Sequence, residues 1–372
     1  MLRPAKRLIT GLMDKAGIEL GRDMTVHDES FYRDVLLRGS LGLGESYVKG
    51  KWDAEKLDDL ITRMLRAELE DRFWLGTVVG LNSLFSSLLT NRQQESRNEE
   101  VADKHYNMGN FLFHSFLDKN RQYSCAYFKK ADTLDEAQVD KMKLIAGKLD
   151  LKEGEHLLDI GCGWGGLANF LAEQYGVRVK GISNSQEQVL FAKTHAHEGT
   201  TFEKKDYRSL EGSYDKILSV GMFEHVGPKN HRTFMRKVDD LLKEGGIFLL
   251  HTIGGHRSVN HTDPWFDREI FPNGVIPSKR QIRKASEGIF EVRDIEEFGP
   301  YYDKTLMAWY DNLKAAWNSI KGKFKDPDRF FRVMEYYLLS SAGTFRSGQN
   351  TVWQYVFARP GEQGGYAAYR LP

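Results

Sequence analysis

In the first part of the chain, apolar residues recur at the spacing of a helix. Beyond about residue 95 this pattern is replaced by helical and strand-like segments that alternate. Residues 57–69 place apolar side chains at helical spacing, and residues 75–89 form a second, more apolar segment. The polar run at residues 91–100 (Asn-Arg-Gln-Gln-Glu-Ser-Arg-Asn-Glu-Glu) is the best linker in the sequence. We therefore predict a small, mostly helical N-terminal domain over residues 1–95 and a second domain over residues 96–372.

Helical and strand-like segments alternate through the second domain. Helices are predicted at residues 135–149, 167–175, 186–195 and 232–242, and apolar strands at residues 156–160, 177–183, 201–205, 216–220 and 247–253. Further strands at 290–298 and 351–359 enclose two helices, at 304–320 and 328–341, that we expect as an insertion over the ligand-binding edge. This order predicts an α/β fold: a seven-stranded, doubly wound parallel sheet with a late antiparallel addition. Ligands of such sheets bind at the carboxyl ends of the strands.

A glycine-rich loop follows the first of these strands and opens a helix. It reads Asp159-Ile-Gly161-Cys-Gly163-Trp-Gly165. Glycine lets the chain turn sharply and lets backbone N–H groups approach a ligand without interference from a Cβ atom. Taken alone the loop is ambiguous, because Gly161, Gly163 and Gly166 also fit the dinucleotide pattern G-x-G-x-x-G.

Two observations favour a methyl donor over a dinucleotide. Asp159, directly before the loop, is typical of methyltransferases that use S-adenosylmethionine. A dinucleotide site also needs an acidic residue at the end of the second strand, and that strand ends in Ser183-Asn184. We interpret the domain as a class I, Rossmann-like methyltransferase, with a purely structural glycine turn as the remaining alternative.

Polar side chains at the next strand ends complete the predicted cofactor site. Ser183, Asn184 and Gln188 offer neutral hydrogen bonds to the ribose and the methionine part. Asp206 ends the third strand, where an aspartate commonly binds the adenine amino group while its neighbour, here Tyr207, covers the ring. Asp206 could instead cap its own loop.

Composition limits the classes of partner. The 372 residues include 53 basic and 52 acidic side chains, so no overall charge favours nucleic acid, although a local basic face could still meet acidic lipids. The two cysteines, Cys125 and Cys162, are too few for a disulfide framework and poorly spaced for a metal site, so no metal is predicted. No segment approaches the roughly 20 apolar residues of a membrane span. We expect a cytoplasmic protein.

Three further clusters fall where the chain would open onto the cofactor: Tyr123-Ser124-Cys125-Ala126-Tyr127, Gly221-Met-Phe-Glu224-His-Val-Gly227 and His251-Thr-Ile253-Gly254. With them the chain resembles the bacterial cyclopropane-fatty-acyl-phospholipid synthases. The resemblance extends from Leu41-Gly-Leu-Gly-Glu-Ser-Tyr47 to Val352-Trp-Gln-Tyr-Val-Phe357, and it includes Phe271-Pro-Asn-Gly274 and Tyr302-Asp-Lys-Thr-Leu-Met-Ala-Trp309.

The resemblance implies a reaction on the cis double bond of a phospholipid acyl chain. The alkene attacks the methyl group of the sulfonium, a carbocation forms, and loss of a proton from that methyl closes a cyclopropane ring. A weak nucleophile of this kind needs proximity and exclusion of water. Aromatic faces stabilise cations by about 0.5–2 kcal/mol each. The entry segment supplies Tyr106, Phe111, Phe113, Phe116, Tyr123, Tyr127 and Phe128, for each of which core packing is the alternative.

The resemblance also implies that a bound bicarbonate ion takes the proton. By that resemblance Cys125, Glu224, His251, the backbone at Ile253, and Tyr302 hold the anion, while Tyr123 and Ser124 join the cofactor site. A thiol, an imidazole and a phenol can donate to an anion. Cys125 could instead be a small buried hydrophobe and His251 a core histidine. Covalent catalysis by Cys125 is disfavoured, because an alkene offers it no electrophile and no acyl transfer occurs.

An acyl chain in a bilayer requires docking on a membrane. The N-terminal domain, including residues 75–89, is our candidate for docking on the inner face of the cytoplasmic membrane, although a helix packed within its own domain is the favoured interpretation of residues 75–89 taken alone. Lys104, Arg121, Lys129 and Lys130 could add headgroup contacts, although for any single one of them a solvated charged face is the favoured interpretation. The resemblance implies a homodimer. Two alternatives stay open: an enzyme that stops at a methyl-branched or methylidene chain, and a non-catalytic lipid-surface binding module.

Overall fold

The computed structural model describes residues 2–69, 109–361 and 366–372. The predicted apolar segment 75–89, the linker 91–100, Lys104 and Tyr106 lie outside these residues. The chain forms two compact units: residues 1–91, 260–274 and 306–350 make the first, and residues 92–259, 275–305 and 351–372 make the second. The predicted domain boundary near residue 95 also lies outside the described residues.

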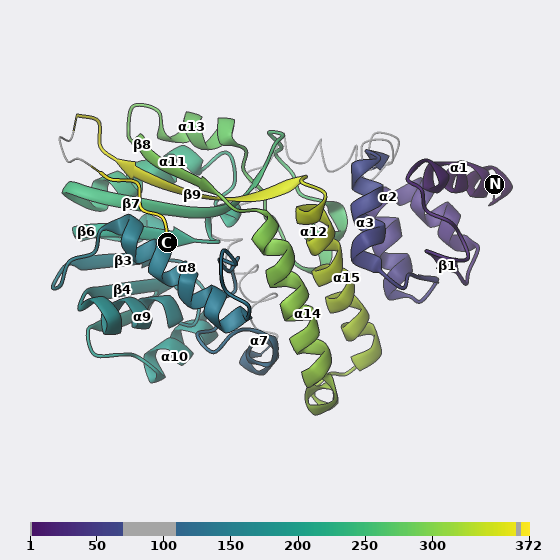
Figure 1. Cartoon of the computed structure of the whole chain (residues 1–372), viewed down its shortest axis with the longest axis horizontal. Coiled ribbons are helices and arrows are strands. Elements are labelled where there is room, and N and C mark those ends of the chain that lie inside the picture. Colours follow the sequence, from purple (N-terminus) through teal and green to yellow (C-terminus); the bar gives the residue numbers. More distant parts are fainter. Residues whose placement is uncertain (1, 70–108, 362–365) are drawn as a thin grey trace. The chain divides into compact units, whose positions relative to one another are not determined.

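The second unit is built on one seven-stranded sheet (Figure 1). Its strands are β3 (His156–Ile160), β4 (Arg178–Ser183), β5 (Thr200–Lys204), β6 (Tyr214–Val220), β7 (Leu242–Gly255), β8 (Glu291–Glu297) and β9 (Asn350–Ala358). They lie in the order β5-β4-β3-β6-β7-β9-β8. The strands β3 to β7 pair in parallel with one another, and β8 is antiparallel to β9. The predicted doubly wound sheet with a late antiparallel addition is confirmed.

Helices cover both faces of this sheet, and successive strand residues point to opposite faces. One hydrophobic cluster joins the sheet to α11 (His231–Leu241) and α13 (Lys279–Ser286). The other joins it to α8 (Leu134–Leu149), α9 (Gly166–Tyr175) and α10 (Gln186–Thr194). Consecutive residues of a strand therefore belong to different clusters. The first cluster contains Leu158, Ile217 and Phe248, and the second contains Leu157, Leu218 and Leu249. Burial on both faces explains why the strands are continuous apolar runs rather than alternating ones.

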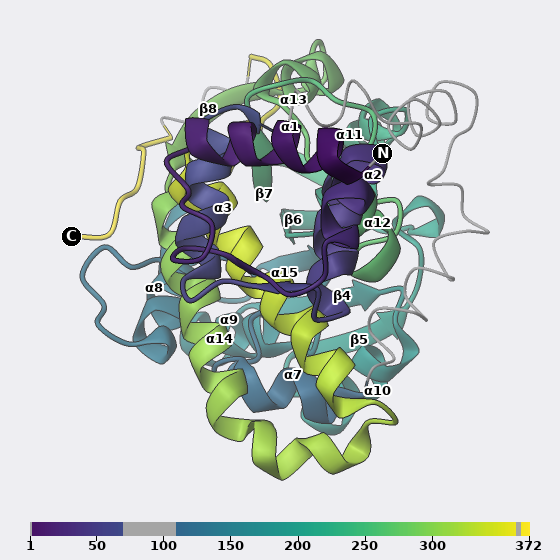
Figure 2. The same ribbon diagram turned by 90° about the vertical axis from the view of Figure 1, so that its right-hand side faces the viewer.

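The first unit is mostly helical, as predicted for its N-terminal part. It contains α1 (Leu2–Lys15), α2 (Ser30–Val48), α3 (Leu57–Arg66), α12 (Pro264–Glu269) and α15 (Pro327–Arg346), with the short strands β1 (Thr25–Val26) and β2 (Trp52–Asp53) (Figure 2). The helix α14 (Pro300–Ile320) begins in the second unit and continues into the first. Both helices predicted between the last two strands are thus confirmed. In the described residues no helix is long and apolar enough to cross a membrane.

The strand β7 begins five residues earlier than the sequence predicts. Residues 243–246, which separate the predicted helix from the predicted strand, belong to the strand, and it continues through Gly245-Gly246 with a shift in register between the pairs Tyr214–Leu242 and Lys216–Ile247. Gly245 has φ 73°, a conformation that glycine adopts readily. The glycine pair therefore forms a bulge inside the strand.

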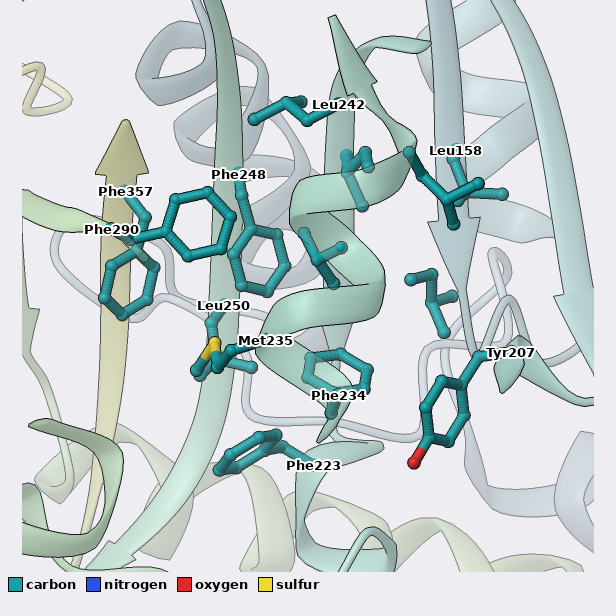
Figure 3. Packing of buried hydrophobic residues seen from close by; sticks show 14 of the residues in the cluster. Leu158, Tyr207, Phe223, Phe234, Met235, Leu242, Phe248, Leu250, Phe290 and Phe357 are labelled. Carbon is teal, nitrogen blue, oxygen red and sulfur yellow. The ribbon is translucent and has the colours of Figure 1, made fainter. Parts of the chain in front are cut away.

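Within the hydrophobic cluster that joins the sheet to α11 and α13, we expect stability to be most sensitive to substitution of Phe234. Its ring is fully buried and lies 5.1 Å from the Tyr207 ring and 5.4 Å from the Phe223 ring (Figure 3). We expect Phe234→Ala to lower the free energy of unfolding by about 3–5 kcal/mol, because it removes apolar burial and leaves a cavity. Urea unfolding measures the change. Arg236→Ala, on the exposed side of the same helix, should change it by less than about 0.5 kcal/mol, and equal losses would contradict this account.

Candidate active site

The predicted site residues follow the carboxyl ends of consecutive parallel strands. Asp159 is the fourth residue of the five in β3 and is followed by the glycine loop, Ser183 ends β4, and Asp206 follows β5. Glu224 lies in a short 3-10 turn after β6, and His251 lies near the end of β7. Because these strands are parallel, their ends share one edge of the sheet, where ligands of this fold class bind.

The glycine loop has the backbone of a ligand cradle. Gly161, Gly163 and Gly165 have φ values of 94°, 54° and 84°, which side-chain-bearing residues rarely adopt. The N–H groups of Gly161 and Cys162 both donate to the carbonyl of Ile182 at 2.9 Å, which ties the loop to β4. A Cβ atom at Gly163 would meet nothing within 4 Å in the described structure. The loop thus leaves space beside the N-terminus of α9, as a bound S-adenosylmethionine requires.

Ser183 and Gln188, both predicted to bind the cofactor, already bind each other. The Ser183 hydroxyl donates to Gln188 Oε1 at 2.9 Å and accepts the N–H of Ser185 at 3.1 Å. These contacts fix the Gln188 amide in position. Its nitrogen and the side chain of the neighbouring Asn184 are then the groups to offer to a ribose or a methionine carboxylate.

Asp206 has the contacts of a loop cap. Its carboxylate accepts the backbone N–H of Arg208 at 2.9 Å and the guanidinium of Arg208 at 2.7 and 2.8 Å. The Tyr207 ring is buried edge-to-face against Phe234 (Figure 3), and burial raises the pKa of Tyr207 to about 12. Recognition of adenine by Asp206 and Tyr207 stays a prediction, and an Asp two residues before an Arg was the sequence signal for the cap.

The aromatic entry segment packs largely on itself. The Phe113 ring lies 5.2 Å from Tyr123 and 5.0 Å from Trp164, and Phe116 lies 6.2 Å from Tyr123. Tyr127 donates its hydroxyl to Glu296 at 2.7 Å. These contacts hold the segment in place next to the glycine loop, since Trp164 belongs to that loop.

The segment around Cys125 is joined to the start of α14. Ala126 donates its N–H to the Thr305 hydroxyl at 3.0 Å, and that hydroxyl donates to the carbonyl of Tyr301 at 2.8 Å. Tyr302, next to Tyr301 in the first turn, is buried. Cys125 is fully buried, and burial raises the pKa of its thiol. The group therefore stays a protonated thiol, a weak donor and not a nucleophile.

Glu224 and Ile253 meet directly. Glu224 Oε1 accepts the N–H of Ile253 at 2.6 Å, so this N–H is committed within the protein. The other oxygen, Oε2, is buried with no hydrogen-bond partner among the described residues. Burial raises the pKa of Glu224 to about 7. A buried oxygen without a partner is costly, so it is suited to a ligand that brings a hydrogen-bonding group.

Lys141 and Gln354 contact the site, and both were missed from sequence. Lys141 is fully buried in α8 and donates to the Ser124 hydroxyl at 2.7 Å. Gln354, fully buried in β9, places its amide nitrogen 3.1 Å from Nδ1 of His251. Each is a polar residue inside a predicted buried element, which is the signal that could have found it.

Lys141 lies within electrostatic range of both the glycine loop and the residues predicted to hold an anion. Its ammonium interacts electrostatically with Cys125, Asp159 and His251, as well as with Asp118. Burial lowers the pKa of Lys141 to about 8 and raises the pKa of Asp159 to about 7. The structure thus brings Cys125, Asp159 and His251 around one buried cation. In the described part of the chain no cluster of His, Cys, Asp or Glu could hold a metal ion.

With this geometry established, comparison with known proteins identifies the family. The family model of mycolic acid cyclopropane synthetase matches residues 93–355. The chain belongs to this family. It is 45% identical over 364 residues to the cyclopropane-fatty-acyl-phospholipid synthase of Escherichia coli K12, covering 96% of this chain and 94% of that protein. It is 33% identical over 286 residues to cyclopropane mycolic acid synthase MmaA2 of Mycobacterium tuberculosis, covering 70% and 97%.

Solved structures agree with this membership. The MmaA2 structure matches with a TM-score of 0.65 at 30% identity, covering 70% of this chain and 98% of that one. Mycolic acid cyclopropane synthase CmaA1 complexed with SAH and CTAB matches with a TM-score of 0.63 at 31% identity, covering 70% and 97%. Coclaurine N-methyltransferase bound to SAH shares the fold, with a TM-score of 0.69 at 21% identity, covering 85% and 99%. The protein is an S-adenosylmethionine-dependent methyltransferase of the class I fold.

The raised pKa of Glu224 predicts how stability depends on pH. The unfolded carboxyl loses its proton near its ordinary value of 4.5, whereas the folded one keeps it until about pH 7. The wild-type protein therefore loses up to about 3 kcal/mol of stability as the pH rises through this window. Glu224→Gln cannot lose a proton, so its stability relative to wild type should increase by that amount from pH 4.5 to pH 8. Denaturant unfolding at both pH values measures the difference, and a pH-independent difference would contradict the prediction.

Proposed function

We propose that the protein transfers the methyl group of S-adenosylmethionine, as a methylene, to the cis double bond of unsaturated phospholipid acyl chains and so forms cyclopropane fatty acids. The observation that carries the proposal is the buried polar set of Cys125, Glu224 and His251 at the same sheet edge as the glycine loop. The family membership and the 45% identity to the Escherichia coli synthase support it.

S-adenosylmethionine, when bound, supplies an electrophilic methyl group. The loop from Asp159 to Gly165 would hold it, with Ser124 kept in place by Lys141. Water has little access, because the residues that surround the chemistry are buried. Exclusion of water protects a carbocation from capture and leaves the alkene as the nucleophile.

The donor set fits a bicarbonate ion, which would supply the base for the last proton. The neutral His251 ring is a donor without competing charge. The protonated Cys125 thiol donates to the carbonyl of Ala126 at 3.3 Å in this structure, so it would have to turn from that carbonyl to donate to the anion. Glu224 Oε2 needs a partner, and the bicarbonate hydroxyl can donate to it. A fully ionised Glu224 carboxylate would repel the bicarbonate ion. Because the pKa of Glu224 is raised, part of the carboxyl is protonated near pH 7 and the repulsion is smaller. Tyr302 completes the proposed set. The backbone of Ile253, also predicted to hold the anion, has its N–H bonded to Glu224 and its carbonyl accepting the Thr252 hydroxyl at 3.0 Å, so in this set it positions Glu224.

Incubation with S-adenosylmethionine and vesicles of an unsaturated phospholipid should give acyl chains heavier by one CH₂, measured by mass spectrometry. We expect His251→Ala to lower this rate by about 10²-fold or more, because a donor to the anion is lost, while cofactor affinity is unchanged. Vesicles of saturated lipid are the control and should give no product.

Three results separate the alternatives in this assay. A ring and a methylidene or methyl-branched alkene chain have the same mass but different fragmentation, and capture of the cation by water adds a further H₂O. Either of these branched products would favour the methyl-branching enzyme. Cofactor binding with no lipid product would leave only a lipid-binding module. Removal of dissolved carbon dioxide should slow the wild-type enzyme, and added bicarbonate should restore the rate; an unaffected rate would remove bicarbonate from the proposal.

We also propose that the N-terminal domain docks the enzyme as a homodimer on the inner face of the cytoplasmic membrane. Among the described residues, α1 supports this with the exposed Arg3, Arg7 and Lys15 and the exposed Leu8, while Lys6 on the same helix is ion-paired with Glu29 at 2.6 Å. Basic residues near an anionic bilayer contribute about 1 kcal/mol each. Light scattering would test the dimer, and a monomeric mass would contradict it.

Charge reversal on α1 tests the docking surface. The double substitution Arg3→Glu and Arg7→Glu should weaken flotation with anionic vesicles by at least about tenfold, because two attractive charges become repulsive. Arg236→Glu with Arg283→Glu, two exposed arginines of the second unit, is the matched control. Equal loss in both pairs would indicate a non-specific charge effect and contradict docking through α1.

A further inference from the structure

Gln354 is a buried amide in an otherwise apolar strand. It lies in the middle of β9, between the buried Trp353 and Tyr355, and its side chain is 0% exposed. In the sheet β9 lies next to β7, which carries His251. Burying an amide costs free energy unless it is hydrogen-bonded. Its contact with His251 Nδ1, at 3.1 Å, therefore marks a specific partner.

The direction of this hydrogen bond determines the state of the imidazole. The amide nitrogen can only donate, so Nδ1 accepts and the ring proton lies on Nε2. Burial lowers the pKa of His251 well below its usual value, and the ammonium groups of Lys141 and Lys148 on α8 act in the same direction. The ring is therefore neutral. Phe298 faces it through an aromatic ring contact, 5.6 Å between centroids.

We propose that Gln354 is a positioning residue that holds His251 as a neutral Nε2–H donor to the anion. The proposal rests on the proposed function and deepens it. With Nδ1 occupied by Gln354 and Nε2 carrying its proton, His251 has no free lone pair. It therefore cannot remove the proton from the transferred methyl group, and that proton is left to the bound anion.

The opposite orientation of the amide would have a different consequence. If Oε1 faced the ring, Nδ1 would carry the proton and the Nε2 lone pair would face the anion and repel it. The groups that could shift this balance are Lys141 and Lys148 on α8, Cys125 and Tyr302 across the proposed anion site, and Glu224 beside β7. Of these, the two lysines act electrostatically on His251, and both favour a neutral ring.

Two substitutions separate positioning from simple packing. Gln354→Glu keeps the shape but offers only acceptors, so it should move the proton to Nδ1 and raise the pKa of His251. Gln354→Met keeps the approximate volume, stays neutral and removes the hydrogen bond. Nitrogen-15 NMR of histidine-labelled full-length protein, with the His251 signal assigned by His251→Ala, reads the tautomer directly. Gln138→Met is the control, because Gln138 is an equally buried amide that donates instead to the carbonyl of Ser124.

We expect Nε2–H in the wild type and in Gln138→Met, and Nδ1–H in Gln354→Glu. Ring formation should fall by about 10- to 100-fold in both Gln354 variants, and the bicarbonate concentration for half-maximal rate should rise while cofactor affinity stays unchanged. The pH profile should shift upward only in Gln354→Glu. An Nδ1–H tautomer in the wild type, or variants that change the melting temperature alone, would overturn the proposal. A wild type with the Nε2–H tautomer but no ring product would instead contradict the proposed function.

Discussion

The buried ammonium group of Lys141 is the interaction on which the arrangement of the site depends. It donates to Ser124 and lies within electrostatic reach of Asp118, Asp159 and Cys125. A buried charge is tolerated only when partners compensate for its lost hydration. The cofactor loop after β3 and the Cys125 segment before α8 therefore compensate the same cation. Movement of either segment would remove some of the groups that compensate the charge of the ammonium. The positions of the glycine loop and of the Cys125 segment are therefore coupled.

Burial shifts the pKa of four ionisable groups near the glycine loop toward the neutral form. Burial raises the pKa of Asp159 and Glu224 to about 7 and lowers that of Lys141 to about 8 and of His251 well below its usual range. Near neutral pH these shifts suit the proposed reaction, in which the site would hold an anion and tolerate a substrate cation without a permanently ionised carboxylate that could capture the cation. Neutral donors and aromatic rings suit such chemistry better than strong charges do.

The sequence predicted those parts of the structure that local patterns encode. Apolar segments of five to seven residues gave the parallel sheet, and the residues after them gave the strand ends at which Asp159, Glu224 and His251 lie. The remaining features depend on contacts between segments that are far apart in the sequence. Gln354 contacts His251, which lies 103 positions earlier in the sequence. The glycine pair at 245–246 lies in a bulge of β7, because β6 pairs with β7 on both sides of it. The Arg208 contact of Asp206 was local and could have been predicted.

The position of β7 between β6 and β9 explains why one strand can supply two groups of the site. His251 and Ile253 are two residues apart, so their side chains lie on one face of the strand. On the β6 side Glu224 accepts the N–H of Ile253, and on the β9 side Gln354 contacts the His251 ring. A slip of one residue in either pairing would turn these side chains to the other face. Strand register, rather than a flexible loop, therefore sets the direction in which His251 donates.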